Sequence, residues 1–194
     1  MRVVFILLVF FLSTIFLTTN TYALEEIGQS QIHPAHPIYF LKTVREEFEK
    51  HFAQTSYVKF MRSLEFGTRR LREVKSLVTV EREDLIEPNL ERYWSHISSL
   101  PQKDLEDKEL AKRIEESLVI HIKTLDKIYH QVSNIRAKMS IRSALNRLMQ
   151  RADLPAYARV PICEFFQKEA TSSSELNEAE KAILLDRAQK CHQL

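Results

Sequence analysis

The chain has 194 residues, enough for one domain with a sizeable buried core. It contains only two glycines. Most hairpin turns and phosphate-binding loops need glycine, so all-β and nucleotide-binding folds are disfavoured. The formal net charge is +2, with no marked asymmetry along the chain, which gives no support for nucleic acid or an anionic membrane as the main partner. We therefore expect an all-α protein.

Residues 1–23 differ in composition from the rest of the chain. Arg2 is their only charge, an apolar run extends from Val3 to Leu17, and Ala23 ends a small-x-Ala sequence typical of a cleavage site. We expect a cleaved signal peptide and a periplasmic or secreted location. The alternative is an uncleaved anchor, since this segment is just long enough to span a bilayer. It is the only expected contact with a membrane.

A polar lead over residues 24–36, which we expect to be flexible, precedes a first helix that ends near Phe52. Pro37 suits the start of this helix, where its missing N–H has no partner to lose. The helical period predicts one apolar side facing the core, made of Leu41, Val44, Phe48 and Phe52. The residues predicted to face water are Arg45, Glu46, Glu49 and Lys50.

A second helix is predicted at residues 57–78, with Thr55 or Ser56 as its N-cap. Its apolar seam alternates steps of three and four and consists of Tyr57, Phe60, Leu64, Gly67, Leu71, Val74 and Val78. A glycine within a helix costs about 1 kcal/mol. Gly67 therefore predicts the close approach of another backbone, namely the first helix folded back antiparallel. Glu65 and Glu73 flank the basic run at residues 69–72, which we interpret as a solvated face.

Two motifs in these helices resemble a known family. The first is His-Pro-Ile-Tyr-Phe-Leu-Lys at residues 36–42, and the second is Gly-Thr-Arg-Arg-Leu-Arg-Glu-Val at residues 67–74. They are similar to the pattern of an exported bacterial family, domain of unknown function 5667. A later segment beginning at His121 extends the similarity to about residues 37–145. The resemblance implies an extracytoplasmic helical domain, but it implies no activity and assigns no functional residues.

A third helix is predicted from Asp84 to Leu100, because Asp84 and Glu87 have the spacing of a capping box and Pro101 follows. Its predicted buried side consists of Ile86, Leu90, Tyr93, Trp94 and Ile97.

The 53 residues from Gln102 to Leu154 contain neither glycine nor proline. An apolar stripe within them consists of Ile114, Leu118, His121, Leu125, Ile128, Val132, Ile135 and Met139. One helix of this length would measure roughly 75 Å at 1.5 Å per residue. The stripe changes phase near Ser140, so we expect one long central helix, bent there, in an elongated bundle that spans residues 37–154.

Residues 155–194 are predicted to form a C-terminal helical hairpin that begins after Pro161. Its loop is expected at residues 171–174, and Asn177 and Glu180 have capping spacing for the last helix. Both cysteines, Cys163 and Cys191, lie in this hairpin. An even cysteine count outside the cytoplasm favours a structural disulfide between them, and the absent Cys-x-x-Cys spacing disfavours thiol redox catalysis.

The seven histidines do not have the spacing of a metal site. His33 and His36 lie on the lead, while His121 and His130 are nine residues apart and so point to opposite helix faces. His121 lies on the apolar stripe, where we expect a hydrogen-bonded core residue. We expect no metal ligands and no cofactor.

The sequence contains no serine nucleophile elbow, no Walker loop and no paired carboxylates in an apolar setting. We therefore do not expect an enzyme, although scattered residues could still converge in a deep polar cleft. The function we expect is a non-catalytic envelope interaction or scaffolding module with an extracytoplasmic protein partner. The alternative is a periplasmic stress-type chaperone or a metal-responsive binding protein.

Overall fold

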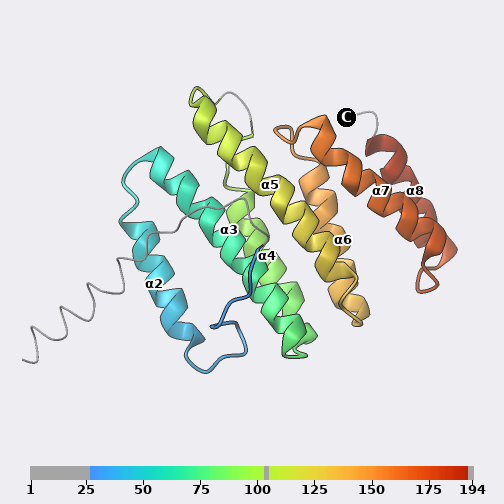
Figure 1. Cartoon of the computed structure of the whole chain (residues 1–194), viewed down its shortest axis with the longest axis horizontal. Helices are drawn as coiled ribbons and strands as arrows, with labels where there is room; N and C mark the ends of the chain where they lie inside the picture. Colours follow the sequence, from blue (N-terminus) through green and yellow to red (C-terminus); the bar gives the residue numbers. More distant parts are fainter. Residues whose placement is uncertain (1–26, 103–104, 192–194) are drawn as a thin grey trace, which may run out of the picture.

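The structure is a computed structural model that describes residues 27–102 and 105–191. The expected signal peptide at residues 1–23 lies outside these ranges. Within them the chain forms seven α-helices and one short 3-10 helix, without strands: α2 (Tyr39–His51), α3 (Ser56–Thr79), η1 (Glu83–Leu85), α4 (Ile86–Ile97), α5 (Lys108–Tyr129), α6 (Ile135–Met149), α7 (Ala156–Ser172) and α8 (Glu178–Cys191). The expected all-α helical bundle is confirmed (Figure 1).

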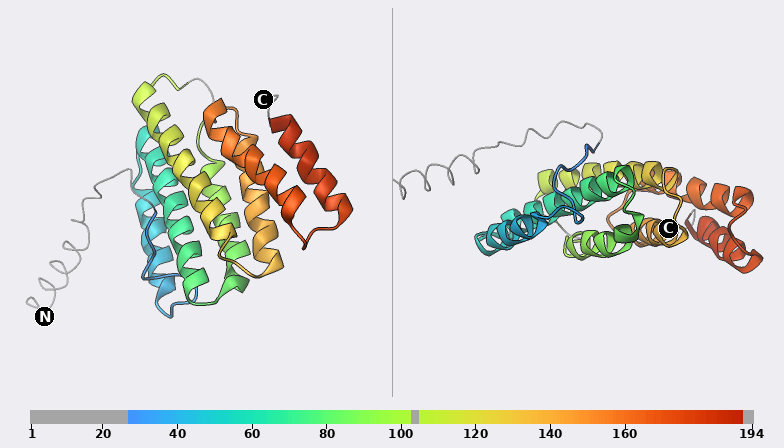
Figure 2. Two further views of the ribbon diagram at one scale, coloured as in Figure 1. Left: turned by 45° about the vertical axis from the view of Figure 1, so that its right-hand side comes forward. Right: turned by 90° about the horizontal axis from the view of Figure 1, so that it is seen from below.

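Four helices form the centre of the molecule in two layers, with α3 beside α5 in one layer and α4 beside α6 in the other (Figure 2). The helix α2 contacts α3 at one edge of this flat array, and the α7–α8 pair lies at the opposite edge. The core between the layers is apolar, and its fully buried members include Leu71, Leu77, Ile86, Tyr93, Ile97, Leu118, Leu125, Ile141 and Leu148. No helix of the described ranges has the length and apolar character to cross a bilayer.

The second helix begins where the capping signal places it. The Thr55 hydroxyl accepts the N–H of Val58 at 3.2 Å, which identifies Thr55 as the N-cap of α3. Gly67, however, lies against α4 and not against the first helix. A Cβ on Gly67 would be 2.7 Å from Cδ1 of Ile97 and 3.7 Å from Cδ2 of Tyr93. The predicted neighbour of this glycine was therefore wrong, because α4 is the helix that packs on the α3 seam.

The prediction of one long central helix is wrong, because α5 ends at Tyr129 and α6 begins at Ile135. Asn134 caps α6, with its Oδ1 accepting the N–H groups of Arg136 at 2.8 Å and Ala137 at 3.2 Å. Ser140, the expected bend, lies inside α6. The apolar stripe is buried only as far as Val132, and its last two members are exposed: Ile135 (58%) and Met139 (51%).

The helix α4 begins without the capping box expected at Asp84 and Glu87. The Asp84 carboxylate instead accepts from the guanidinium of Arg82, and a 3-10 turn leads into Ile86. The buried side of α4 is close to the prediction, since four of its five residues are buried and Trp94 is partly buried.

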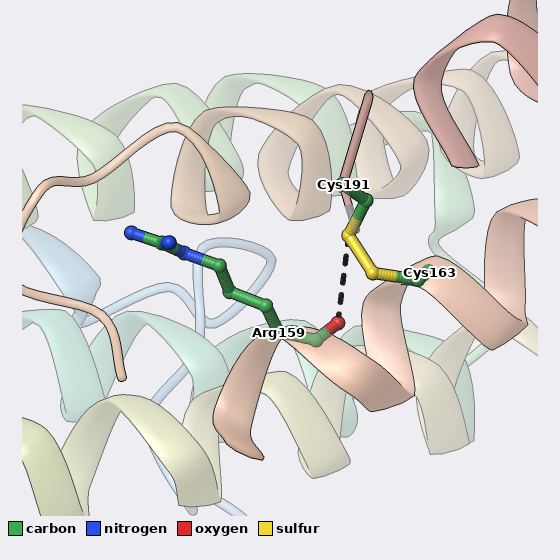
Figure 3. Close-up of a disulfide and its surroundings, with 3 residues drawn as sticks. All are labelled: Arg159, Cys163 and Cys191. Atoms are coloured by element: carbon green, nitrogen blue, oxygen red, sulfur yellow. Dashed lines mark hydrogen bonds between the residues drawn. A yellow bond between two sulfur atoms is a disulfide. The ribbon is translucent and has the colours of Figure 1, made fainter. Parts of the chain in front are cut away.

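The expected C-terminal hairpin is present, formed by α7 and α8. Its first helix starts at Ala156, so that Pro161 lies within α7 and not before it. Asn177 and Glu180 cap α8 reciprocally, each accepting the other's backbone N–H at 2.9 Å. Cys163 and Cys191 are joined in a disulfide with a Cα–Cα distance of 5.7 Å. Figure 3 shows this bond beside the Arg159 carbonyl oxygen, 3.7 Å from Cys191 Sγ.

Candidate functional site

The most unusual feature of the molecule is the orientation of α2, which is the reverse of the prediction. The residues expected in the core are exposed, including Val44 (49%), Phe48 (59%) and Phe52 (69%). Glu46, expected in water, is only 5% exposed. We name the exposed apolar surface the α2 face and define it by Phe40, Leu41, Val44, Phe48 and Phe52.

The buried side of α2 explains this orientation, because it carries charged groups that pair with α3. Arg70 of α3 is 2% exposed and lies at the centre. Its Nη1 donates to Glu73 Oε2 at 2.8 Å and also to the Tyr39 hydroxyl, and its Nη2 donates to Glu46 Oε2. Lys42 Nζ completes the set, 2.6 Å from Glu73 Oε1. We name these residues the ionic cluster: Tyr39, Lys42, Glu46, Arg70 and Glu73.

Burial shifts the proton equilibria of the ionic cluster. It raises the pKa of Glu46, against the lowering effect of Arg70, and it lowers the pKa of Lys42, against the raising effect of Glu73. Burial together with the Glu73 carboxylate raises the pKa of Tyr39 to about 12. Desolvating ion pairs offsets much of their attraction, so a buried cluster contributes little net stability. It does fix the rotation of α2, since Glu46 can reach Arg70 only with the apolar residues turned outward.

A second group of contacts extends this cluster to neighbouring segments. Arg69 lies between Glu65, at 2.5 Å, and Glu49, at 3.1 Å, with its guanidinium 5.0 Å from the centre of the Phe66 ring. Asn89 of α4 donates to the Arg70 carbonyl at 2.9 Å. The basic run at residues 69–72 is therefore not the solvated face we expected, because only the Arg72 side chain is exposed.

The lead, expected to be flexible, runs over the same region in the residues that the structure describes. Lys42 Nζ donates to Ser30 Oγ at 3.2 Å and to the Ile32 carbonyl at 3.1 Å. The N–H of Ser30 donates to Ser76 Oγ of α3 at 2.8 Å. The lead thus covers one end of the ionic cluster and leaves the α2 face open.

The α2 face is hollowed along one side. An open depression of about 630 Å³ is lined by Thr43, Val44, Glu47, Phe48, His51 and Phe52. Each phenylalanine offers about 150–250 Å² of apolar surface when fully exposed. Contiguous apolar patches of several hundred square ångströms on a protein are commonly binding sites. The α2 face can therefore accept apolar side chains of another molecule.

A second depression, of about 550 Å³, lies over α5 between α3 and α7. Its floor includes Val119 and Ile120, and its rim includes Lys123, Asp126 and Tyr157. Charges of both signs surround it, so its lining indicates no particular ligand.

His121 occupies the predicted core position and is 1% exposed. Its Nε2 lies 2.9 Å from Thr68 Oγ1, and its Nδ1 lies 3.3 Å from the Tyr93 hydroxyl. Because the Thr68 hydroxyl already donates to the Leu64 carbonyl, it accepts from Nε2–H, and Nδ1 accepts from Tyr93. Burial lowers the pKa of His121 to about 3, so the ring is neutral. The expected hydrogen-bonded core histidine is confirmed.

His33 and His36 lie on the lead, as the sequence indicates. The His33 and His36 rings are adjacent on the lead, with centroids 6.3 Å apart. Across the part of the chain that the structure describes, no three or more His, Cys, Asp or Glu residues are grouped to hold a metal ion.

The fold and the surface together define the class of protein. It is a helical protein with one disulfide, and buried charged residues hold the apolar side of one helix outward. Residues 31–134, which are 104 of the 194 residues, match the family model for Domain of unknown function (DUF5667), and the chain belongs to this family. The match covers the last six residues of the lead (31–36), α2 to α5 and the turn before α6. No curated protein and no solved structure matches the chain.

The motif residues behind the family resemblance meet in three dimensions. Tyr39 and Lys42 come from the first motif, and Arg70 and Glu73 come from the second; all four belong to the ionic cluster. Sequence reasoning missed this arrangement, although a signal was present. Tyr39, Lys42 and Glu46 recur at helical spacing along α2, as the apolar residues do on its other side.

Proposed function

We propose that this protein is an extracytoplasmic interaction module that binds a protein partner through the α2 face. The observation that carries the proposal is the outward orientation of five large apolar side chains, four on α2 and one on its C-cap residue, Phe52. Exposing such a surface is unfavourable, and a partner that covers it recovers about 25 cal/mol for each square ångström buried. The ionic cluster supports a specific role, because it holds the face in one rotation before binding occurs.

The proposed location has support from the C-terminal hairpin. The Cys163–Cys191 disulfide joins α7 to α8, and such bonds persist mainly in oxidising compartments outside the cytoplasm. A signal peptide at residues 1–23 would deliver the chain there.

The test places a photo-crosslinking amino acid at position 48 of the protein in its own cells. Position 183 is the matched control, because Ile183 is 51% exposed on α8, at the opposite edge of the molecule. We expect one discrete protein adduct from position 48 and none of that mass from position 183. Phe52→Ser should then weaken binding of the identified partner about 10-fold or more in a purified system, since burying a phenylalanine contributes about 1.5–3 kcal/mol.

A ladder of many adducts from position 48, together with suppressed aggregation of a denatured client, would favour the chaperone function instead. Equal adducts from positions 48 and 183 would contradict any role for the α2 face.

A further inference from the structure

The partner of the α2 face can be inferred from its area and from the charges at its edges. Phe40, Phe48 and Phe52 are 60%, 59% and 69% exposed, and Leu41 and Val44 are about half exposed. With about 150–250 Å² for each aromatic ring, the face offers roughly 500 Å². Two such faces packed together would bury about 1,000 Å², at the lower limit for a specific interface. The area therefore suffices for a weak dimer.

The charges beside the α2 face do not suit a lipid surface. Membrane-surface helices carry Lys and Arg along their polar side, where these meet anionic headgroups. On α2 that side is buried in the ionic cluster, and the other Arg, Lys and Glu residues of this helix are paired with residues of opposite charge. Arg45 pairs with Glu49 at 3.0 Å, and Lys50 pairs with Glu47 at 2.9 Å. A protein surface of matching pattern is the better occupant.

The edges of the α2 face carry opposite charges. Successive helical residues are about 100° apart, so Arg45 lies at one edge of the strip through Val44 and Phe48, and Glu47 lies at the other. Both charged residues are exposed. When two copies of one helix pair in parallel, the edge that carries Arg45 in each copy meets the edge that carries Glu47 in the other copy. Arg45 would then lie opposite the partner's Glu47 twice, whereas antiparallel pairing would set the Arg45 edge against the Arg45 edge and the Glu47 edge against the Glu47 edge, without these opposite-charge pairs.

The position of α2 leaves room for this pairing. It lies at the outer edge of the flat molecule, with α3 on its inner side and no helix on its outer side among the described residues (Figure 2). A second molecule can approach this edge without moving any described element.

We infer that the occupant of the α2 face is a second copy of this chain, with the two α2 helices packed in parallel. This inference rests on the proposed function and names its partner. The apolar strip supplies the contact area, and the Arg45–Glu47 pairs at both edges select the parallel arrangement.

Sedimentation velocity of the protein purified from its own cells, from micromolar to submillimolar concentration, tests the inference. We expect a reversible dimer, weakened at least 10-fold by Phe48→Ser and unchanged by the control Ile183→Ser. Arg45→Glu and Glu47→Arg should each weaken it about 3-fold or more, and the double variant Arg45→Glu/Glu47→Arg should restore it. Circular dichroism and melting temperature verify that each variant remains folded.

Recovery of the dimer by the double variant Arg45→Glu/Glu47→Arg can arise only from contacts between two chains. Residues two apart on a helix do not face each other, so 45 and 47 cannot compensate within one molecule. The double variant still lacks the two ion pairs within α2, Arg45–Glu49 and Lys50–Glu47, so restored dimerisation could not come from restoring those pairs. A monomer at every concentration, or a dimer that the double variant does not restore, overturns the inference. If the protein is monomeric while position 48 crosslinks to a different protein, the proposed function stands and only the dimer fails.

Discussion

Glu83 caps a helix that begins more than fifty residues later: its Oε2 accepts the N–H of Asn134 at 2.6 Å. The same oxygen accepts the N–H of Ser133 at 3.0 Å. The first amides of a helix have no partners within it, and a carboxylate there also complements the helix dipole. Glu83 therefore helps to fix the turn between α5 and α6 and the start of α6.

Replacing Glu83 with alanine should lower the free energy of unfolding by about 1–2 kcal/mol, the usual effect of losing an N-terminal cap. Urea denaturation followed by circular dichroism measures the change. Glu164→Ala, at an exposed position within α7, is the control and should change stability by less than about 0.5 kcal/mol. Equal effects of the two substitutions would contradict the capping role.

Arg70 and Arg72 are near neighbours in α3 with opposite environments. Arg70→Met should cost about 3–5 kcal/mol, because it leaves the carboxylates of Glu46 and Glu73 buried without their guanidinium partner. Arg72→Met, at an exposed position, should cost less than about 0.5 kcal/mol. Denaturant titration of both proteins measures the difference. A loss at Arg70 no larger than that at Arg72 would mean that the ionic cluster does not hold α2.

Gly67 and Ile97 should be coupled in stability. Gly67→Ala gains about 1 kcal/mol of helix propensity, but its Cβ would lie 2.7 Å from Cδ1 of Ile97, a side chain that is 0% exposed and packed in the core. Overpacking costs about 1–3 kcal/mol, so we expect a net loss near 1 kcal/mol. Ile97→Val removes that methyl group. The double-mutant cycle should show a favourable coupling of about 1 kcal/mol or more, and strict additivity would contradict the contact.

His121 should make stability depend on pH. Its folded-state pKa, lowered by burial to about 3, lies below the ordinary value of 6.5. Between these values the unfolded chain binds a proton that the folded chain does not. Stability should therefore be complete above pH 6.5 and fall as the pH is lowered toward 3, with a slope of up to about 1.4 kcal/mol per unit. Burial lowers the pKa of His96 to about 4, which adds in the same direction.

Denaturation between pH 7 and pH 4 measures this slope. His121→Gln should flatten it, and His130→Gln, at an exposed position after α5, should leave it unchanged. Equal slopes for the wild-type protein and His121→Gln would contradict the assignment.

The central apolar stripe shows which structural features the helical period of a sequence can predict and which it cannot. The stripe from Ile114 to Ile128 correctly predicted the buried side of α5, and Val132, in the turn after it, is also buried. It continued in register through Ile135 and Met139, yet these two residues are exposed in a separate helix. A helical period depends only on the spacing of residues along the chain, so it did not predict the end of α5 at Tyr129 and the start of α6 at Ile135. Ser133-Asn134, a capping pair in the sequence, was the local signal for the start of α6.

The sequence by itself determined the all-α class, an N-cap of α3 at Thr55 or Ser56, the Asn177–Glu180 cap, the buried side of α4 and the family of the chain. Each follows from local preferences or a contiguous motif. Only the tertiary structure decided which side of α2 faces inward and which residue from elsewhere in the chain holds the turn between α5 and α6. Helix α2 carries both a polar and an apolar stripe, and the choice depends on Arg70 and Glu73 of another helix. The start of α6 has a local signal in Ser133-Asn134, but its backbone N–H groups are also bound by Glu83, a distant residue that the local sequence does not contain.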